Sequence, residues 1–172
     1  QSVYATSKLL GDWFACGAPR GYVLRVESLF GGGAEKVLPG GRQLGSTLDR
    51  MVDTMLAGRP VQGATDRTVS PSYVPDVVAA TRALLDGGAE PGLYHCVNDG
   101  QATWFEVAAA VADRLGCRSL LSPVMMADLS MRAPRPKFCA LSNRKLAAAG
   151  VSLPPWEDAL DRYLALRTRN GH

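Results

Sequence analysis

The sequence predicts an α/β protein with a mainly parallel sheet and a smaller lobe beside it. Segments with the three-to-four-residue apolar spacing of helices alternate with short apolar runs typical of buried strands. The connections between them are mostly short, and this alternation is typical of parallel sheets covered by helices. A chain of 172 residues, of which 47% are hydrophobic, can bury the core of about one domain.

The first half of the chain begins in a helix. That helix, ended by Gly17 and Pro19, places five apolar side chains on the face that we expect to be buried: Val3, Leu9, Leu10, Trp13 and Phe14. We then expect a strand over 21–30, a glycine-rich loop over 31–45 that forms a lid, a helix over 46–57 capped by Ser46, and a strand over 60–63. Residues 66–73 are predicted to form a loop with a short edge strand, and Pro75 to open a helix that ends at Gly87.

The second half continues the alternation. We expect strands over 92–97, 119–124 and 138–141, and helices over 103–116, 142–149 and 156–167. Thr103 with Glu106 three residues later forms a capping-box pattern at a helix start. The last helix should turn four side chains inward: Trp156, Leu160, Tyr163 and Leu164. We place residues 1–86 mainly in the sheet domain and 87–172 mainly in the smaller lobe, with interleaved segments.

Composition and charge exclude several classes of protein. The net charge is +3 and the cations are scattered among the acids, so we expect no nucleic-acid partner. The chain has no apolar run near 18 residues, so we expect no membrane span. Its four cysteines lie far apart with no CxxC pair, which predicts reduced thiols in a cytoplasmic protein and no metal site.

Tyr4 and Lys8 form the first candidate site. On a helix they leave the same face about 6 Å apart along the axis. A free phenol, with a pKa of about 10, exchanges protons poorly at neutral pH, and a nearby ammonium favours the phenolate. The pair is therefore suited to general acid catalysis by tyrosine. A solvated helix that carries the two residues by chance is the alternative.

Six segments carry a family resemblance. VYATSK followed by LLGDW resembles the tyrosine–lysine helix of extended short-chain dehydrogenases/reductases. In chain order there follow VLRVESLFGG, the turn from Asp66 to Ser72, GLYHCVNDGQATWFEVA, RAPRPKFCALSNRKL and PPWEDAL. This set is similar to the dTDP-4-dehydrorhamnose reductase family of sugar-nucleotide reductases and covers nearly all of the chain.

The resemblance implies a fold and a catalytic set. The fold would be the second part of a Rossmann-type parallel sheet plus a small α/β substrate-binding lobe. Tyr4 would give the proton to the sugar carbonyl, and Lys8 would hold the nicotinamide ribose and favour the tyrosine phenolate. Glu27 would lie beside the nicotinamide of the cofactor, NADP or NAD.

The resemblance also implies substrate contacts. Ser28 stands where the family often has a larger residue, frequently Trp, that faces the sugar. Arg135, and with less support Arg67, would lie near the phosphates of a nucleotide-sugar substrate, where a planar cation can donate paired hydrogen bonds. A surface ion pair is the alternative for each arginine.

The implied function is NAD(P)H-dependent reduction of a nucleotide-linked 4-keto sugar in deoxysugar or polysaccharide precursor biosynthesis, by an enzyme that could form a homodimer. The sequence lacks the glycine-rich turn of a dinucleotide-binding half, so we expect a portion of a longer enzyme that is nearly inactive alone. A non-catalytic module that binds sugar nucleotides or regulates, and an epimerase or dehydratase of the same superfamily, are the alternatives.

Overall fold

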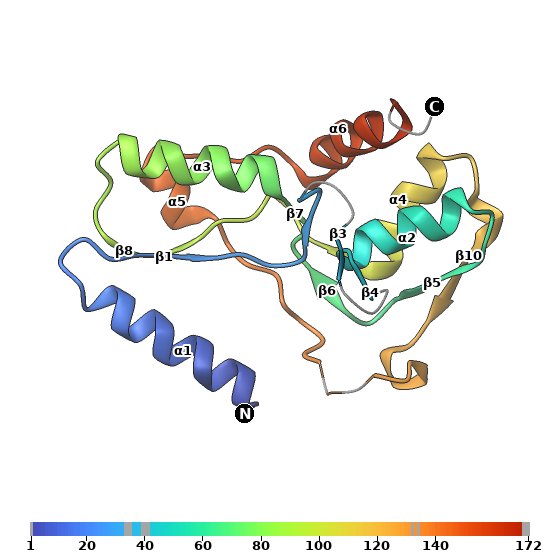
Figure 1. Ribbon diagram of the computed structural model, residues 1–172, viewed down its shortest axis with the longest axis horizontal. Helices are drawn as coiled ribbons and strands as arrows, with labels where there is room; N and C mark the ends of the chain where they lie inside the picture. Colours follow the sequence, from blue (N-terminus) through green and yellow to red (C-terminus); the bar gives the residue numbers. More distant parts are fainter. Residues whose placement is uncertain (1, 33–35, 39–41, 132, 134, 170–172) are drawn as a thin grey trace.

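The computed structural model describes residues 2–32, 36–38, 42–131, 133 and 135–169, arranged in two lobes (Figure 1). The helices are α1 (Val3–Cys16), α2 (Thr47–Leu56), α3 (Val74–Asp86), α4 (Trp104–Arg114), α5 (Arg144–Ala148) and α6 (Trp156–Arg169). The strands are β1 (Tyr22–Arg25), β2 (Leu29–Phe30), β3 (Lys36–Leu38), β4 (Arg42–Leu44), β5 (Val61–Ala64), β6 (Thr68–Val69), β7 (Ser72–Tyr73), β8 (Gly92–His95), β9 (Ala102–Thr103) and β10 (Leu121–Val124). The predicted α/β class is confirmed.

The first lobe is built on the parallel pair β1 and β8, in which Tyr22 lies opposite Gly92. Helices α3 and α5 cover one face of this pair, where Leu84 and Leu146 pack against Tyr94. Helix α1 lies along the other face (Figure 1).

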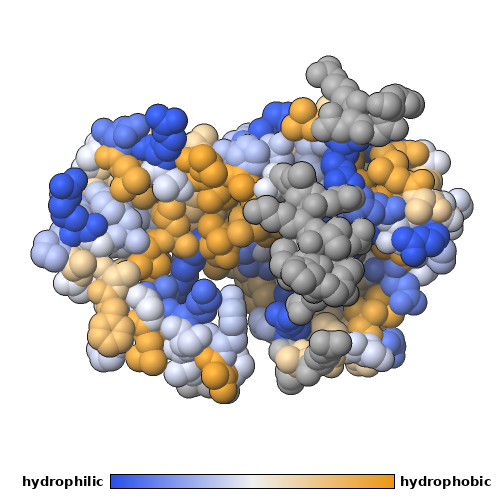
Figure 2. Space-filling view, in the orientation of Figure 1, coloured by the Kyte–Doolittle hydropathy of each residue, from blue (hydrophilic) through white to orange (hydrophobic). Residues whose placement is uncertain are grey.

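The predicted burial of the apolar face of α1 is wrong. No residue of α1 is buried, and the exposed fractions reach 81% for Phe14 and 88% for Val3. Within the described part of the chain only β1 and β8 lie beneath the helix. Two strands about 5 Å apart are narrower than a helix about 10 Å across, so they cover only part of its surface. Apolar side chains consequently lie on the surface at the lower left of the molecule (Figure 2).

The second lobe is built on the parallel pair β5 and β10, which packs against α4. Both predicted helix starts are confirmed: Ser46 with Asp49, and Thr103 with Glu106, form complete capping boxes. The four predicted inward side chains of the last helix, Trp156, Leu160, Tyr163 and Leu164, are all buried.

The strand predicted over 21–30 is two strands. Ser28 adopts a φ of +45°, a left-handed conformation that no strand tolerates, and the chain turns there from β1 into β2. The prediction that 31–45 is only a loop is also wrong, because β3 and β4 pair as an antiparallel hairpin within it. Residues 33–35 and 39–41 of the predicted lid lie outside the described residues.

The predicted edge strand in 66–73 is an inner one. Strand β6 pairs with β9, and Thr68 also forms a parallel bridge with Phe138, so the strand has neighbours on both sides. The strand expected over 138–141 is reduced to that bridge. Each of the two hydrophobic cores contains residues from before and after position 86. The predicted division of the chain into two domains at that position stays a prediction. The described helices are all too short or too polar to cross a membrane.

Candidate functional site

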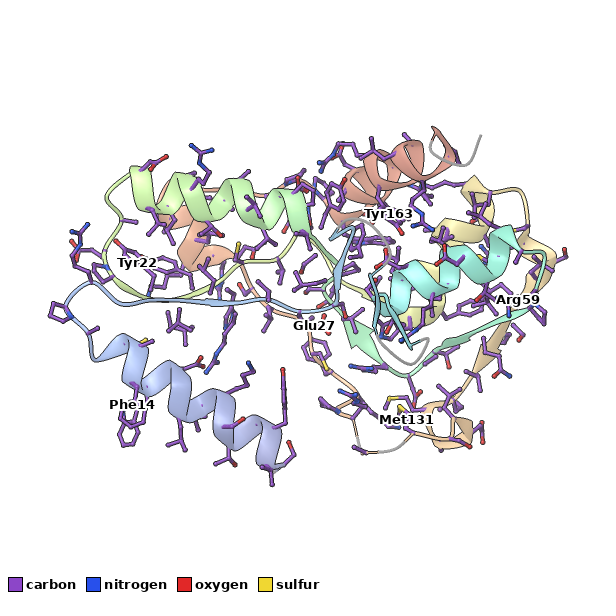
Figure 3. The ribbon with its side chains drawn as sticks, viewed as in Figure 1. Phe14, Tyr22, Glu27, Arg59, Met131 and Tyr163 are labelled. Carbon is purple, nitrogen blue, oxygen red and sulfur yellow. The ribbon has the colours of Figure 1, made fainter. Side chains whose placement is uncertain are left out.

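The candidate site begins at the carboxyl end of β1. In parallel α/β sheets, ligands bind beyond the carboxyl ends of the strands. Strand β1 ends at Arg25, and Glu27 follows it where the chain passes from one lobe to the other (Figure 3).

Glu27 is held by hydrogen bonds on both carboxylate oxygens. Ser28 Oγ donates to Oε1 at 2.7 Å, and the backbone N–H of Ser70 donates to Oε2 at 2.7 Å. Burial nevertheless raises the pKa of Glu27 above its ordinary value, although both hydrogen bonds and the charge of Arg67 act to lower it. The site therefore holds a fixed, partly desolvated carboxyl group.

Arg67 lies close enough for its charge to act on Glu27. The residue is half-buried, and its Nε has no hydrogen-bond partner among the described residues. A buried guanidinium donor without an acceptor is costly, so Arg67 is an unusual feature of this site. The structure thus brings together three of the predicted residues: Glu27, Ser28 and Arg67.

Tyr4 and Lys8 lie on the first two turns of α1, one turn apart as predicted, and Lys8 Nζ is 5.8 Å from the centroid of the Tyr4 ring. The helix starts at Ser2, whose hydroxyl accepts a hydrogen bond from the Ala5 backbone N–H. Tyr4 is 69% exposed, so its hydroxyl is open to a substrate.

An ion pair fixes α1 against the end of β1. Arg25 donates from Nε and Nη2 to one carboxylate oxygen of Asp12, at 2.9 and 2.8 Å. The start of α1 lies toward the same end of the sheet as the carboxyl end of β1 (Figure 1). The start of α1, the helix that carries Tyr4 and Lys8, therefore lies toward the end of the sheet at which Glu27 follows β1 (Figure 1).

Arg135 lies on an exposed segment that runs beside β6. The Thr68 N–H donates to the Lys137 carbonyl at 2.8 Å, and the Cys139 N–H donates to the Thr68 carbonyl at 2.9 Å. Among the described residues, Arg135 forms no hydrogen bond or ion pair with Glu27 or Arg67, so the structure places it on a neighbouring segment without joining it to them.

Two residues at this site escaped sequence reasoning. Asp66 accepts a hydrogen bond from the Met126 N–H and pairs with Lys137 at 2.8 Å, and these contacts hold the pKa of its carboxyl below its usual range. Ser70 is fully buried and holds Glu27. Hydrophobic periodicity could not identify either residue, because both lie in a segment with turn composition. The one sequence signal for a functional role here was the acidic residue at the start of the Asp66–Ser72 turn.

The residues present fit one end of a dinucleotide. Tyr4, Lys8 and Glu27 are a hydroxyl, a cation and a carboxylate, which are the groups that the family resemblance implies for a nicotinamide and its ribose. Gly31 offers no phosphate cradle, because a Cβ there would lie 2.3 Å from Tyr73 Cε2, so its φ of +71° serves packing. The described part of the chain therefore has side chains suited to the nicotinamide end of a dinucleotide. It contains no glycine-rich turn of the kind that holds a pyrophosphate.

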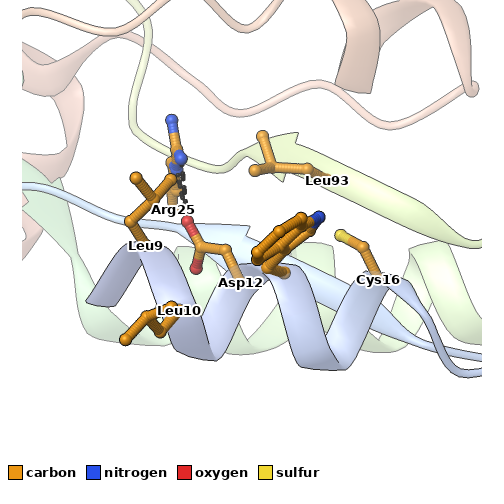
Figure 4. Close-up of a pocket in the computed structure, with 7 residues that line it drawn as sticks. Leu9, Leu10, Asp12, Cys16, Arg25 and Leu93 are labelled. Atoms are coloured by element: carbon orange, nitrogen blue, oxygen red, sulfur yellow. Dashed lines mark hydrogen bonds and ion pairs between the residues drawn. The ribbon is translucent and has the colours of Figure 1, made fainter. Parts of the chain in front are cut away.

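A separate pocket of about 460 Å³ lies between α1 and the strands (Figure 4). Leu9, Trp13 and Leu93 line it with the Asp12–Arg25 pair. It contains none of the predicted site residues.

The fold and the site define an α/β protein whose candidate site lies at the carboxyl end of a parallel strand. More specifically, the chain belongs to the family described as the RmlD substrate binding domain, whose family model matches residues 1–168.

Curated relatives agree with this family. The chain is 34% identical over 169 residues to a dTDP-4-dehydrorhamnose reductase of Mycobacterium tuberculosis, with 96% of this chain and 52% of the relative covered. It is 30% identical over 167 residues to a reductase of the same name from Mycolicibacterium smegmatis, with 95% and 48% covered. The chain thus spans about half the length of the curated relatives it matches.

Solved structures share the fold. A dTDP-4-dehydrorhamnose reductase from Clostridium acetobutylicum superimposes with a TM-score of 0.83 at 22% identity, covering 98% of this chain and 56% of that one. A reductase of the same name from Bacillus anthracis, in complex with NADP, gives 0.80 at 23% identity, covering 95% and 55%. A dTDP-glucose 4,6-dehydratase from Bacillus anthracis, in complex with NAD, gives 0.73 at 19% identity, covering 99% and 53%.

Proposed function

We propose that the protein containing this chain reduces a nucleotide-linked 4-keto sugar, with NADPH or NADH as reductant, in the synthesis of a deoxysugar or polysaccharide precursor. The observation that carries the proposal is the placement of Tyr4 and Lys8 together on α1, at the sheet end where Glu27 is fixed, in a chain of this family.

The chemistry of the step divides between cofactor and chain. A bound NADPH or NADH would supply the hydride that the carbonyl carbon receives and would itself be oxidised. Tyr4 gives its hydroxyl proton to the carbonyl oxygen, which becomes the product hydroxyl. Lys8 holds the nicotinamide ribose in this proposal, and its Nζ lies 5.8 Å from the centroid of the Tyr4 ring on the same helix.

Glu27, Ser28, Arg67 and Arg135 position the reactants in this proposal. Glu27 faces the nicotinamide, and Ser28, which donates to its carboxylate, leaves space toward the sugar. Arg67 and Arg135 offer guanidinium donors to the substrate phosphates, and the closeness of Arg67 to Glu27 supports its part in this. The chain alone should be nearly inactive, because its described residues include no pyrophosphate cradle. A homodimer in the cytoplasm is the expected assembly.

The experiment follows cofactor consumption by the longer protein. With a dTDP-4-keto sugar and NADPH or NADH, a reductase consumes one reduced cofactor per sugar, and 4-deuterated cofactor leaves deuterium on the sugar carbon that carried the carbonyl. Product formation without net cofactor consumption would instead favour the second candidate, an epimerase or dehydratase. The structural likeness to a dTDP-glucose 4,6-dehydratase supports that candidate. A non-catalytic module is disfavoured because both Tyr4 and Lys8 are present.

A further inference from the structure

Ser70 joins three segments of the chain at the site. Fully buried between β6 and β7, it donates its backbone N–H to Glu27 Oε2 at 2.7 Å. Its Oγ accepts a hydrogen bond from the Leu141 backbone N–H at 3.1 Å and lies 3.5 Å from the Gly100 carbonyl oxygen. Main chain and side chain of one residue thus contact different parts of the site.

The hydroxyl of Ser70 continues the pairing that attaches the segment carrying Arg135. Thr68 contributes the first two hydrogen bonds, to the Lys137 carbonyl and from the Cys139 N–H. At Leu141 the next main-chain donor finds the Ser70 hydroxyl as its acceptor. An unpaired N–H in a half-buried segment costs free energy, so this hydroxyl, together with the Thr68 bonds, helps to fix the 137–141 segment against β6.

We infer that Ser70 is a positioning residue for the nucleotide-sugar, an inference that rests on the proposed function. Its backbone N–H fixes Glu27 beside the reacting centre. Its hydroxyl fixes the segment that carries Arg135 beside the substrate phosphates. The two contacts are separable, because Ser70→Ala removes the hydroxyl and keeps the backbone donor.

The chain provides a matched control in Ser72. Ser72 is also fully buried and lies two residues away, at the start of β7. Its Oγ donates to the Ser70 carbonyl at 3.1 Å, a local contact that reaches no other segment. Ser72→Ala therefore removes an equivalent buried hydroxyl without releasing Leu141.

The first test measures amide hydrogen exchange in the longer protein. Ser70→Ala should speed exchange at Leu141 about fivefold or more, since its donor loses its acceptor. Ser72→Ala should leave the Leu141 rate at the wild-type value, and Ser70→Thr, which keeps a hydroxyl, should restore it. An unchanged Leu141 rate in Ser70→Ala would overturn the inference.

The second test measures steady-state kinetics of the same variants. We expect Ser70→Ala to raise the KM for the nucleotide-sugar about three- to tenfold and to keep kcat within about twofold, because Glu27 is still held. A loss in kcat with unchanged KM would overturn the positioning role. If the wild-type protein reduces no 4-keto sugar, the proposed function fails, whereas the exchange rate at Leu141 still decides whether Ser70 holds that segment.

Discussion

Arg162 donates two hydrogen bonds to the carboxylate of Asp76, at 2.8 and 2.7 Å, and so joins α6 of the second lobe to α3 of the first. Asp76 also accepts from the buried Asn98 side chain at 2.7 Å, and Asn98 Oδ1 accepts from the Tyr73 N–H at 2.8 Å. The Arg162 guanidinium carbon lies 5.2 Å from the centroid of the Tyr73 ring. These four residues form a closed ring of contacts. The ring fixes the position of the two lobes relative to each other, and so the position of the site between them.

Asp76→Asn should lower the free energy of unfolding by about 1–3 kcal/mol, because charge-assisted hydrogen bonds to a mostly buried group are lost. Asp158→Asn is the control: Asp158 is 54% exposed and accepts one bond from the same arginine, so it should cost under about 1 kcal/mol. Urea unfolding of both variants measures the difference, and equal losses would contradict the importance of the ring.

The stabilisation that this ring gives to the fold should decrease in acid. Burial opposes ionisation of Asp76, but hydrogen bonds from Arg162 and Asn98 outweigh it, so the pKa of this carboxyl lies below its ordinary value. A group with a lowered folded-state pKa stabilises the fold above its unfolded pKa, near 4, and loses that contribution as the pH falls through the folded pKa. The stability difference between wild type and Asp76→Asn should therefore be constant from about pH 5 to 7 and shrink below about pH 4. A difference that grows in acid would contradict this assignment.

Glu27 should behave in the opposite way. Since burial raises its pKa, the folded state favours the protonated form, and stability is lost as the pH rises through the folded pKa. The glutamine side chain of the Glu27→Gln variant cannot ionise. The free energy of unfolding of the variant should therefore increase relative to that of the wild type as the pH rises from about 4 to 7. Chemical unfolding at several pH values tests this, and a wild type that gains on the variant over the same range would show that the hydrogen bonds from Ser28 and Ser70 dominate.

Local patterns predicted the helices better than the strands. Ser46, Thr103 and Gly17 were identified as helix ends because capping depends on residues within one turn, and the structure confirms all three. The break at Ser28 was missed, because a left-handed residue inside an apolar run leaves no periodic signal. The burial of α1 was wrong, because apolar spacing marks a face and does not specify what covers it.

For the candidate site too, contacts within one helix could be predicted and contacts between distant segments could not. Tyr4 and Lys8 are four residues apart on one helix, so their proximity could be predicted from spacing. The contacts of Glu27 with Ser70, and of Ser70 with Leu141, join residues 43 and 71 positions apart. Such contacts depend on the path of the chain between the lobes, which the sequence patterns did not determine.

The most direct measurement is the rate of NADPH or NADH oxidation by the longer protein with a dTDP-4-keto sugar, in wild type and in Tyr4→Phe. Phenylalanine keeps the exposed ring on α1 and removes the proton donor, so we expect the rate to fall by about a hundredfold or more. Circular dichroism and binding of the nucleotide-sugar should be unchanged, since Tyr4 packs into neither hydrophobic core. A Tyr4→Phe variant that reduces the sugar at the wild-type rate would contradict the assignment of this chain to catalysis.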